Sequence, residues 1–305
     1  MWARLTGVED NRKHDFNHKG NKMARITPKV SVLTPIYNTN PTHLRECIES
    51  ILNQTFTDFE FLILNDSPEN TELDKVVKSY KDDRIKYFKN EKNLGIAPSR
   101  NKLVKMARGE YVAIFDHDDI SVPTRLEKEV TYLDAHPEIG VVSGWLQYFD
   151  KDNHVHQTPQ DDGDIRIMLT DNCWVAHTAA MIRKPILVDN NIEYESFYSP
   201  AEDYQLWARL IDVTKFHNIQ EVLVNYRTYS TNTSNTQKNK MDYMRNQISS
   251  HIADNHTFLR KKFEHEYSRD TLFRMRLFSI IPLLKIKHNW VLLFEFIPVV
   301  KLRWK

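Results

Sequence analysis

The chain has 305 residues, of which 41% are hydrophobic and 27% charged, and its formal net charge is +1. This is the composition of a globular protein long enough to bury a large core, and its seven Gly residues include neither G-x-G-x-x-G nor G-x-x-x-x-G-K-[ST], which argues against the two common glycine-rich phosphate loops. The only two Cys residues, Cys47 and Cys173, exclude a disulfide scaffold and a C-x-x-C site and favour a reducing, cytoplasmic compartment.

The first half of the chain alternates between strand and helix patterns. Residues 1–28 are polar, and we expect a disordered leader without a secretory signal, with Met23 as a second candidate start. Beyond them, strands are predicted at residues 30–36, 59–64, 84–88 and 111–115, and helices at residues 41–52, 71–80, 97–108 and from 123 onward. Gly109 fits the position that follows the third helix. The alternation predicts βαβ units and a mainly parallel sheet flanked by helices.

The second half is less regular. We predict a strand or hairpin at 139–149, a polar loop at 151–164, strands at 179–182 and 221–226, a helix from Ser199 and a polar helical segment at 237–266. In parallel sheets, ligands bind beyond the carboxyl ends of the strands. Polar residues follow three of the predicted strands, at Tyr37-Asn38, Asn65-Asp66 and Asp116–Asp119. These three strand ends therefore mark the candidate binding edge.

An acidic cluster at residues 115–119 (FDHDD) follows a buried strand. Residues two apart in an extended segment point the same way, so Asp116 and Asp118 are predicted to face the ligand together. Carboxylates so placed favour a cation between them, and Mg²⁺ typically takes one or two carboxylates with phosphate oxygens and water. One alternative is a calcium loop, although Ser121 replaces its required Gly. The other is an acidic strand-to-helix turn with Asp119 at the helix N-terminus.

A second polar cluster lies at residues 199–207 (SPAEDYQLW). Ser199 as N-cap and Glu202 three residues later predict a capping box. Asp203 then projects from the first turn, where the helix dipole favours the ionised carboxylate that a general base needs. We interpret Trp207 as a core residue, with a stacking platform for a sugar as the alternative.

The charge of the chain is concentrated at its C-terminus. Residues 269–305 contain eight Lys or Arg and two Asp or Glu, a net charge of +6, which leaves −5 for residues 1–268. The body is therefore not a nucleic-acid binder by charge. Lys285, Lys287, His288 and Glu295 interrupt the apolar stretch, so an interfacial segment on an anionic membrane is favoured over a spanning helix. The alternative is an element packed on the domain.

Taken together, these residues resemble a family 2 glycosyltransferase with the GT-A fold. The resemblance covers about residues 28–235 and rests on the order of its motifs. They are VSVLTPIYN (30–38), CIESILNQT (47–55), the acidic end of the second strand (64–66), NLGIAPSRN (93–101), the D-x-D region DHDDISVP (116–123) and EDYQLW (202–207). It implies a leader at 1–28, a GT-A domain at 29–235 with a nucleotide half (29–120) and an acceptor half (121–235), and a helical, basic-aromatic C-terminal extension at 236–305.

The resemblance also implies roles for individual residues. Asp203 is expected to be the general base and Glu202 to support the acceptor pocket, while Asp118 and Asp116 are expected to hold Mg²⁺ or Mn²⁺. The nucleotide-sugar is expected to contact Pro35, Tyr37, Asn38, Asp66, Arg100, Asp116, His177 and Arg227. For His177, a structural histidine at a strand start is the alternative.

One position departs from the family pattern. The family often has Tyr-Arg-x-His, whose His helps to bind the metal or phosphate, whereas this chain reads Tyr226-Arg227-Thr228-Tyr229. Either Arg227 and the loop at 229–234 hold the diphosphate, or the metal is bound more weakly. The departure leaves the third metal ligand open.

The implied activity is the inverting transfer of a sugar from a nucleotide-sugar, with a UDP-sugar favoured, to a glycan or lipid-linked acceptor. The implied process is surface polysaccharide synthesis at the cytoplasmic face of the inner membrane. The oligomeric state, the sugar and the acceptor stay open. Three alternatives are a sugar-nucleotide pyrophosphorylase, a non-catalytic nucleotide-sugar binder or scaffold, and a membrane- or nucleic-acid-binding module driven by the tail. The first lacks its Gly-rich loop after the opening strand, and the intact Asp116, Asp118 and Asp203 argue against the second.

Overall fold

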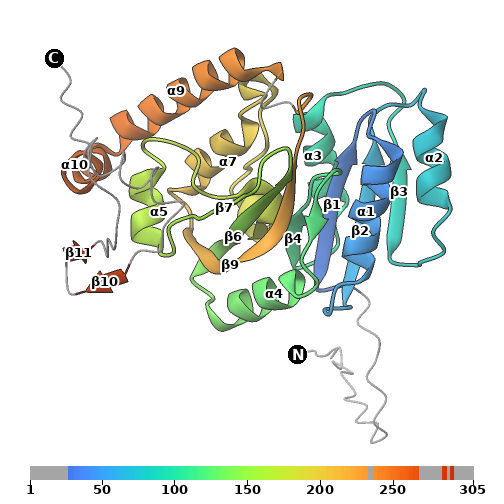
Figure 1. Ribbon diagram of the computed structural model, residues 1–305, viewed down its shortest axis with the longest axis horizontal. Coiled ribbons are helices and arrows are strands. Elements are labelled where there is room, and N and C mark those ends of the chain that lie inside the picture. The colour runs from blue at the N-terminus through green and yellow to red at the C-terminus, as the bar shows by residue number, and fades with distance from the viewer. Residues whose placement is uncertain (1–26, 233–235, 268–283, 287–288, 292–305) are drawn as a thin grey trace, which may run out of the picture.

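A computed structural model describes residues 27–232, 236–267, 284–286 and 289–291. Its centre is a nine-stranded sheet in the order β3-β2-β1-β4-β8-β6-β9-β5, with β7 paired to β6 (Figure 1). The strands are β1 (Val30–Ile36), β2 (Phe59–Asn65), β3 (Ile85–Lys89), β4 (Tyr111–Ile114), β5 (Ile120–Ser121), β6 (Ile139–Asp150), β7 (His154–His156), β8 (Met181–Arg183) and β9 (Lys215–Thr228). The predicted α/β class with a mainly parallel sheet is confirmed.

The parallel part of the sheet is β3-β2-β1-β4. Val30 of β1 aligns with Phe59 of β2 on one side and with Tyr111 of β4 on the other. All seven residues of β1 are buried because the strand is central and both its faces are covered, which is why it reads as a continuous apolar run. Beyond β4 the sheet is mixed, since β8 runs antiparallel to β4 and β6 while β9 runs parallel to β6.

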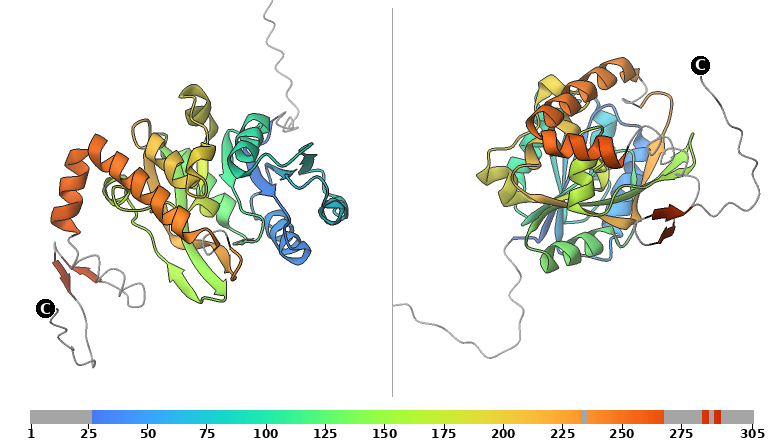
Figure 2. Two further views of the ribbon diagram at one scale, coloured as in Figure 1. Left: turned by 90° about the horizontal axis from the view of Figure 1, so that it is seen from above. Right: turned by 90° about the vertical axis from the view of Figure 1, so that its left-hand side faces the viewer.

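Helices cover both faces of the sheet (Figure 2). They are α1 (Pro41–Leu52), α2 (Thr71–Lys78), α3 (Ile96–Met106), α4 (Arg125–Ala135), α5 (Asp162–Met168), α6 (Lys184–Asp189), α7 (Glu202–Leu210), α9 (Lys238–Asn255) and α10 (Thr257–Glu266). One core lies under α1, α2 and α4, and the other lies under α3, α5, α6, α7 and α9. Trp207 is fully buried in the second core, which confirms the core interpretation.

Two local predictions are wrong in detail. Gly109 does not terminate α3, which ends at Met106 with Ala107 as its C-cap. A Cβ at Gly109 would lie 2.5 Å from the backbone nitrogen of Ser31, so Gly is needed there for close approach to β1 rather than for a helix end. The segment predicted as a polar loop, 151–164, contains β7 and the first residues of α5.

The C-terminal extension is helical over α9 and α10, and α9 packs on α7. Farther along, β10 (Leu284–Ile286) and β11 (Asn289–Val291) form an antiparallel pair. The prediction of a helical extension at 236–305 did not include these strands. The leader predicted at 1–28 and the basic-aromatic segment at 269–305 lie mostly outside the described residues. Within the described part of the chain, no helix combines the length and apolarity that crossing a bilayer requires.

Candidate active site

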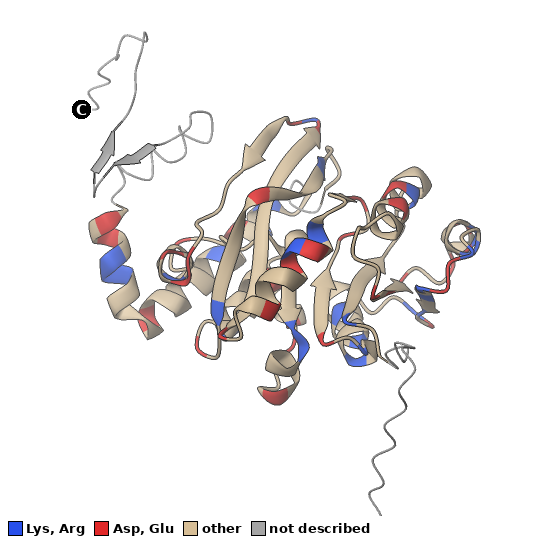
Figure 3. Ribbon diagram, turned by 90° about the horizontal axis from the view of Figure 1, so that it is seen from below, with Lys and Arg blue, Asp and Glu red and all other residues tan. Residues whose placement is uncertain are grey.

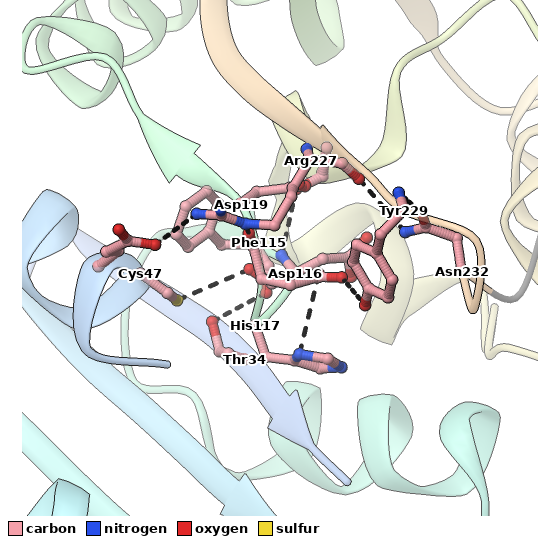
Figure 4. A network of polar contacts seen from close by, with 12 residues as sticks. Thr34, Cys47, Phe115, Asp116, His117, Asp119, Arg227, Tyr229 and Asn232 are labelled. Atoms are coloured by element: carbon pink, nitrogen blue, oxygen red, sulfur yellow. Dashed lines mark hydrogen bonds and ion pairs between the residues drawn. The ribbon is translucent and has the colours of Figure 1, made fainter. Parts of the chain in front are cut away.

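The acidic turn after β4 is anchored by its third carboxylate, that of Asp119. This side chain is 1% exposed and accepts hydrogen bonds from the backbone nitrogen of Arg227 (2.9 Å) and the hydroxyl of Thr178 (2.8 Å). Burial, followed by the charges of Asp118 and Asp116, raises the pKa of Asp119. Because both carboxylate oxygens of Asp119 are hydrogen-bonded to neighbouring segments, Asp119 fixes the turn that carries Asp116 and Asp118 (Figure 4).

Asp116 and Asp118 each have one carboxylate oxygen held by a neighbouring side chain. Asp116 Oδ1 accepts from Nη2 of Arg100 at 2.9 Å, and Asp118 Oδ2 accepts from the hydroxyl of Tyr229 at 2.5 Å. Tyr229, which stands where the family pattern has His, thus contacts the predicted metal ligand Asp118 directly. Burial, with the charge of Asp118 next, raises the pKa of the Tyr229 phenol, so the phenol stays protonated and donates this bond.

These residues fit a divalent cation of the Mg²⁺ type. Asp116 and Asp118 offer hard carboxylate oxygens on one turn, and Mg²⁺ is commonly bound through one or two carboxylates while substrate phosphates and water complete its shell. Among the described residues, no group of three or more His, Cys, Asp or Glu side chains is arranged to hold a metal ion. A metal would therefore take at most two ligands from these carboxylates and the rest from the diphosphate and water.

Arg227 is a clamp that holds the acidic turn in place. Its side chain is 7% exposed, and Nε donates to the carbonyl oxygen of Asp118 at 2.8 Å. Nη1 and Nη2 pair with Asp150 at 2.8 Å and Glu46 at 2.5 Å, and the guanidinium stacks over Phe149. The guanidinium ties together α1, β6 and the turn, so we expect it to position Asp118. This geometry does not favour the predicted direct contact of Arg227 with the diphosphate.

A buried ion-pair chain connects the acidic turn to the start of α7. Arg100, on α3 and 7% exposed, pairs through Nη2 with Asp116 and through Nη1 with Glu202 Oε1 at 2.6 Å. Glu202 is 5% exposed, and its other oxygen is buried without a hydrogen bond from any described residue. Glu202 therefore keeps one unused acceptor atom next to Asp203 in the chain.

The predicted capping box is wrong. Helix α7 begins at Glu202, its N-cap is Ala201, and no side chain caps it. The Glu202 carboxylate bonds to Arg100 instead, because a charge-assisted pair is stronger than a bond to a backbone N–H.

Asp203 lies in the first turn of α7 and is half-buried, with Oδ1 accepting from the backbone nitrogen of Tyr204 at 2.7 Å. Burial, followed by the charge of Glu202, raises the pKa of Asp203 to about 6, whereas Arg100 opposes the shift. The dipole argument predicted an ionised carboxylate, and a group with this pKa is still ionised at neutral pH. The raised pKa makes it a better proton acceptor than an ordinary Asp.

His177 is a structural neighbour of this chain of ion pairs. It is 8% exposed, and its Nε2 lies 2.9 Å from the hydroxyl of Tyr194. Burial and then the charge of Arg100 lower the pKa of His177 to about 3, so the imidazole is neutral across the physiological range. These contacts favour the structural interpretation of His177 over a ligand contact.

The remaining predicted nucleotide residues lie at the ends of β1 and β2. Pro35 is buried within β1, whereas Tyr37 is 51% exposed and Asn38 has a positive φ of 45°. Asp66 is 3% exposed and accepts from the backbone nitrogens of Leu94 (2.8 Å) and Gly95 (2.9 Å). Asp66 therefore organises the loop before α3, while Tyr37 and Asn38 stay available at the surface.

Sequence reasoning missed four residues of the site: Glu46, Asp150, Thr178 and Tyr194. No local motif marks the two carboxylates that hold Arg227, since they lie 181 and 77 residues away from it in the chain. Thr178 follows His177 directly, so only its adjacency to a candidate residue offered a signal.

The mostly parallel sheet flanked by helices is the arrangement of GT-A glycosyltransferases. A model of Glycosyl transferase family 2 matches residues 31–191, more than half of the chain. The chain belongs to this family and is a glycosyltransferase.

Relatives and solved structures agree with that assignment. An uncharacterized glycosyltransferase of Methanocaldococcus jannaschii is 37% identical over 207 residues, covering 66% of this chain and 71% of the relative. The O-antigen biosynthesis glycosyltransferase WbnJ of Escherichia coli is 28% identical over 228 residues, covering 72% and 86%. The fold is similar to that of S. aureus TarS in complex with UDP-GlcNAc, with a TM-score of 0.58 at 18% identity over 79% of this chain and 76% of that one. It is also similar to a Pyrobaculum calidifontis mannosyltransferase in complex with GDP-Man and Mn²⁺, with a TM-score of 0.53 at 13% identity over 83% and 85%.

Proposed function

We propose that this protein is an inverting, divalent-metal-dependent glycosyltransferase that acts in cell-surface polysaccharide synthesis. Its donor is a nucleotide-sugar, with a UDP-sugar favoured, and its acceptor is a hydroxyl of a glycan or of a lipid-linked molecule. The observation that carries the proposal is the continuous chain Asp116–Arg100–Glu202, which ends beside the half-buried Asp203. It joins a candidate diphosphate site to a candidate base. The names of the relatives support the substrate class, since WbnJ acts in O-antigen biosynthesis and the structural neighbours hold UDP-GlcNAc or GDP-Man.

The proposed reaction is a single displacement. Asp203 accepts the proton of the acceptor hydroxyl as that oxygen forms a bond to the anomeric carbon, on the face opposite the leaving group. The bond from the anomeric carbon to the diphosphate oxygen breaks, and its electron pair leaves with the nucleoside diphosphate. The configuration inverts, so an α-linked donor gives a β-glycoside. Asp116 and Asp118 would hold Mg²⁺ or Mn²⁺, which supplies charge neutralisation of the diphosphate.

A binding experiment tests the proposal directly. Calorimetry with UDP, GDP and dTDP, with and without Mn²⁺ or Mg²⁺, is expected to give metal-dependent binding of one nucleotide. Asp118→Ala should abolish the metal dependence. Tyr229→Phe should weaken metal binding by about tenfold, because it removes the hydrogen bond that orients Asp118.

The matched control is Asp161→Ala, which removes a carboxylate that is 76% exposed and lies outside the site; it should leave binding unchanged. If folded protein binds none of the three nucleotides, the transferase proposal is wrong, and a scaffold or membrane-binding role takes its place. If binding is equal with and without metal, the metal part of the proposal is wrong.

The proposal includes a peripheral position at the cytoplasmic face of the inner membrane, through the basic-aromatic residues 269–305. Deleting these residues is expected to leave nucleotide binding intact and to abolish cosedimentation with vesicles that contain anionic lipid. Equal cosedimentation of the full and shortened chains would contradict this part of the proposal.

A further inference from the structure

Five aromatic and histidine rings from four separate segments form a continuous row on the β7-β6-β9 side of the sheet. Tyr148 of β6 lies at its centre, with ring centroids 5.0 Å from Tyr226 of β9 and 4.4 Å from His154 of β7. The row continues through His156, 6.1 Å from Tyr148, to Trp174, 6.1 Å from His156. We call these five rings the ring row.

The register of the strands places these rings on one face. Tyr148 is aligned with Tyr226 on β9 and with His154 on β7, so the three side chains lie side by side across the strands. Tyr148, His156, Trp174 and Tyr226 are half-buried, and His154 is exposed. Rings in this state keep part of their faces accessible to a ligand.

One end of the ring row lies beside the acidic turn of the candidate active site. At one end, Tyr226 directly precedes Arg227, whose guanidinium holds Asp118. Burial and then the charge of Asp119 raise the pKa of the Tyr226 phenol, as expected for a hydroxyl near the acidic turn. At the other end, Trp174 packs against Ile167 and Met168 of α5 and Phe263 of α10. The row therefore runs from the strand beside the acidic turn toward α5 and α10.

The strand segments that carry the rings are themselves uncharged. There is no Lys, Arg, Asp or Glu on β7, on β6 before Asp150, or on β9 between Glu221 and Arg227 (Figure 3). Aromatic faces offer apolar area, while the phenol, imidazole and indole edges offer hydrogen bonds, and this pairing suits a neutral sugar, which has both apolar C–H faces and hydroxyls. The charged side chain that acts most strongly on Tyr148 is Arg245 of α9, which opposes the rise that burial causes in the pKa of the Tyr148 phenol.

Trp174 supplies an independent sign of a missing ligand group. Its indole nitrogen is buried and has no hydrogen-bond partner among the described residues. A buried N–H without a partner is costly, and such groups are usually satisfied in the functional state. A sugar hydroxyl seated on the ring row would satisfy it.

We propose that the ring row binds the glycan part of the acceptor, as an oligosaccharide that presents more than one sugar ring. This inference rests on the proposed function and deepens it, because it selects a carbohydrate rather than a lipid headgroup as the portion of the acceptor that is recognised. A single sugar covers only part of the row, so affinity should increase with the number of sugar units.

Saturation-transfer NMR tests the proposal on the full chain in the presence of UDP and Mn²⁺. The probes are chitotriose, cellotriose and maltotriose, each compared with its monosaccharide. At least one trisaccharide is expected to show stronger transfer than its monosaccharide, and its Kd should rise about tenfold in His156→Ala. Trp174→Phe, which keeps the apolar ring and removes the N–H, should weaken binding in the same direction and protects the test against a variant that fails to fold.

Tyr132→Ala is the matched control. Tyr132 is stacked between His136 (4.1 Å) and His217 (4.0 Å), in a Tyr–His stack away from the ring row, and its loss should leave trisaccharide binding unchanged. No transfer to any trisaccharide in the wild type, or equal transfer in His156→Ala and Trp174→Phe, would overturn the proposal. So would binding of anionic vesicles that these variants abolish. Nucleotide binding is measured on the same samples, so failure of the proposed function is recognised separately, as loss of nucleotide binding itself.

Discussion

Replacing Asp203 with Asn is expected to lower kcat by a factor of about 10²–10⁴, the usual contribution of a positioned general base. Asn keeps the size of the side chain and an oxygen that can accept from the backbone nitrogen of Tyr204, so α7 should be unchanged. Nucleotide binding should stay within about twofold of the wild type, because Asp203 is not part of the acidic turn. Transfer rates at saturating donor and calorimetric nucleotide affinity measure the two quantities separately.

The pH dependence of the wild type provides a second measure of the same residue. A base must be deprotonated to act, so activity should fall as pH decreases through the pKa of Asp203, which is about 6. His177, with its pKa lowered to about 3, adds no second inflection between pH 5 and 8. In Glu202→Gln the acid limb should move to lower pH, because the charge that helps to raise the pKa of Asp203 is gone. A limb that stays in place in Glu202→Gln, or a kcat that is insensitive to Asp203→Asn, would assign the base elsewhere.

The parts of the site that lie within one motif were predictable from sequence. The acidic turn follows a buried strand, and Asp203 lies in the first turn of a predicted helix, so local propensity and strand-end polarity were enough to select them as candidates. The parallel half of the sheet was predictable for the same reason, since each strand and helix carries its own apolar pattern.

Contacts between distant segments were not predictable. Arg100 and Glu202 are 102 residues apart, and their pairing removes the Glu202 side chain from the capping box that the local sequence indicates. Arg227 shows the same effect, since its position after Tyr226 suggested a phosphate ligand whereas Glu46 and Asp150 surround it in the fold. In both cases a long-range charge-assisted contact outweighs the local signal.

A fully buried ion pair of α4 contacts the end of β4, the strand that leads into the acidic turn. Arg125 and Glu129 of α4 are both 0% exposed, and Nε of Arg125 lies 3.1 Å from Oε1 of Glu129. Nη2 of Arg125 also donates to the carbonyl oxygens of Ile114 (2.9 Å) and Ala180 (3.4 Å), at the end of β4 and just before β8. The guanidinium thus joins α4 to the two strands that flank the turn.

Arg125→Met is expected to destabilise the protein by about 3–5 kcal/mol, because it leaves the Glu129 carboxylate buried without a cation. Burial already raises the pKa of Glu129 to about 7 against the opposing effect of Arg125, so removal of Arg125 should raise it further. A carboxyl group whose folded pKa exceeds its unfolded pKa loses stability as pH rises between the two values. The deficit of the variant should therefore be larger at pH 8 than at pH 5, measured as the free energy of unfolding in urea.

Two further variants separate the charge effect from lost packing. Arg125→Met combined with Glu129→Leu removes both charges and should recover most of the deficit and its pH dependence, since an apolar pair of similar volume is often as stable as a buried ion pair. Lys262→Met on α10 breaks an exposed i,i+4 pair with Glu266, at 40% and 42% side-chain exposure, and should cost less than about 1 kcal/mol. If the double variant is as unstable as Arg125→Met, the lost stability comes from the hydrogen bonds to the carbonyl oxygens of Ile114 and Ala180 rather than from the Glu129 charge. The main role of Arg125 is then to hold the end of β4.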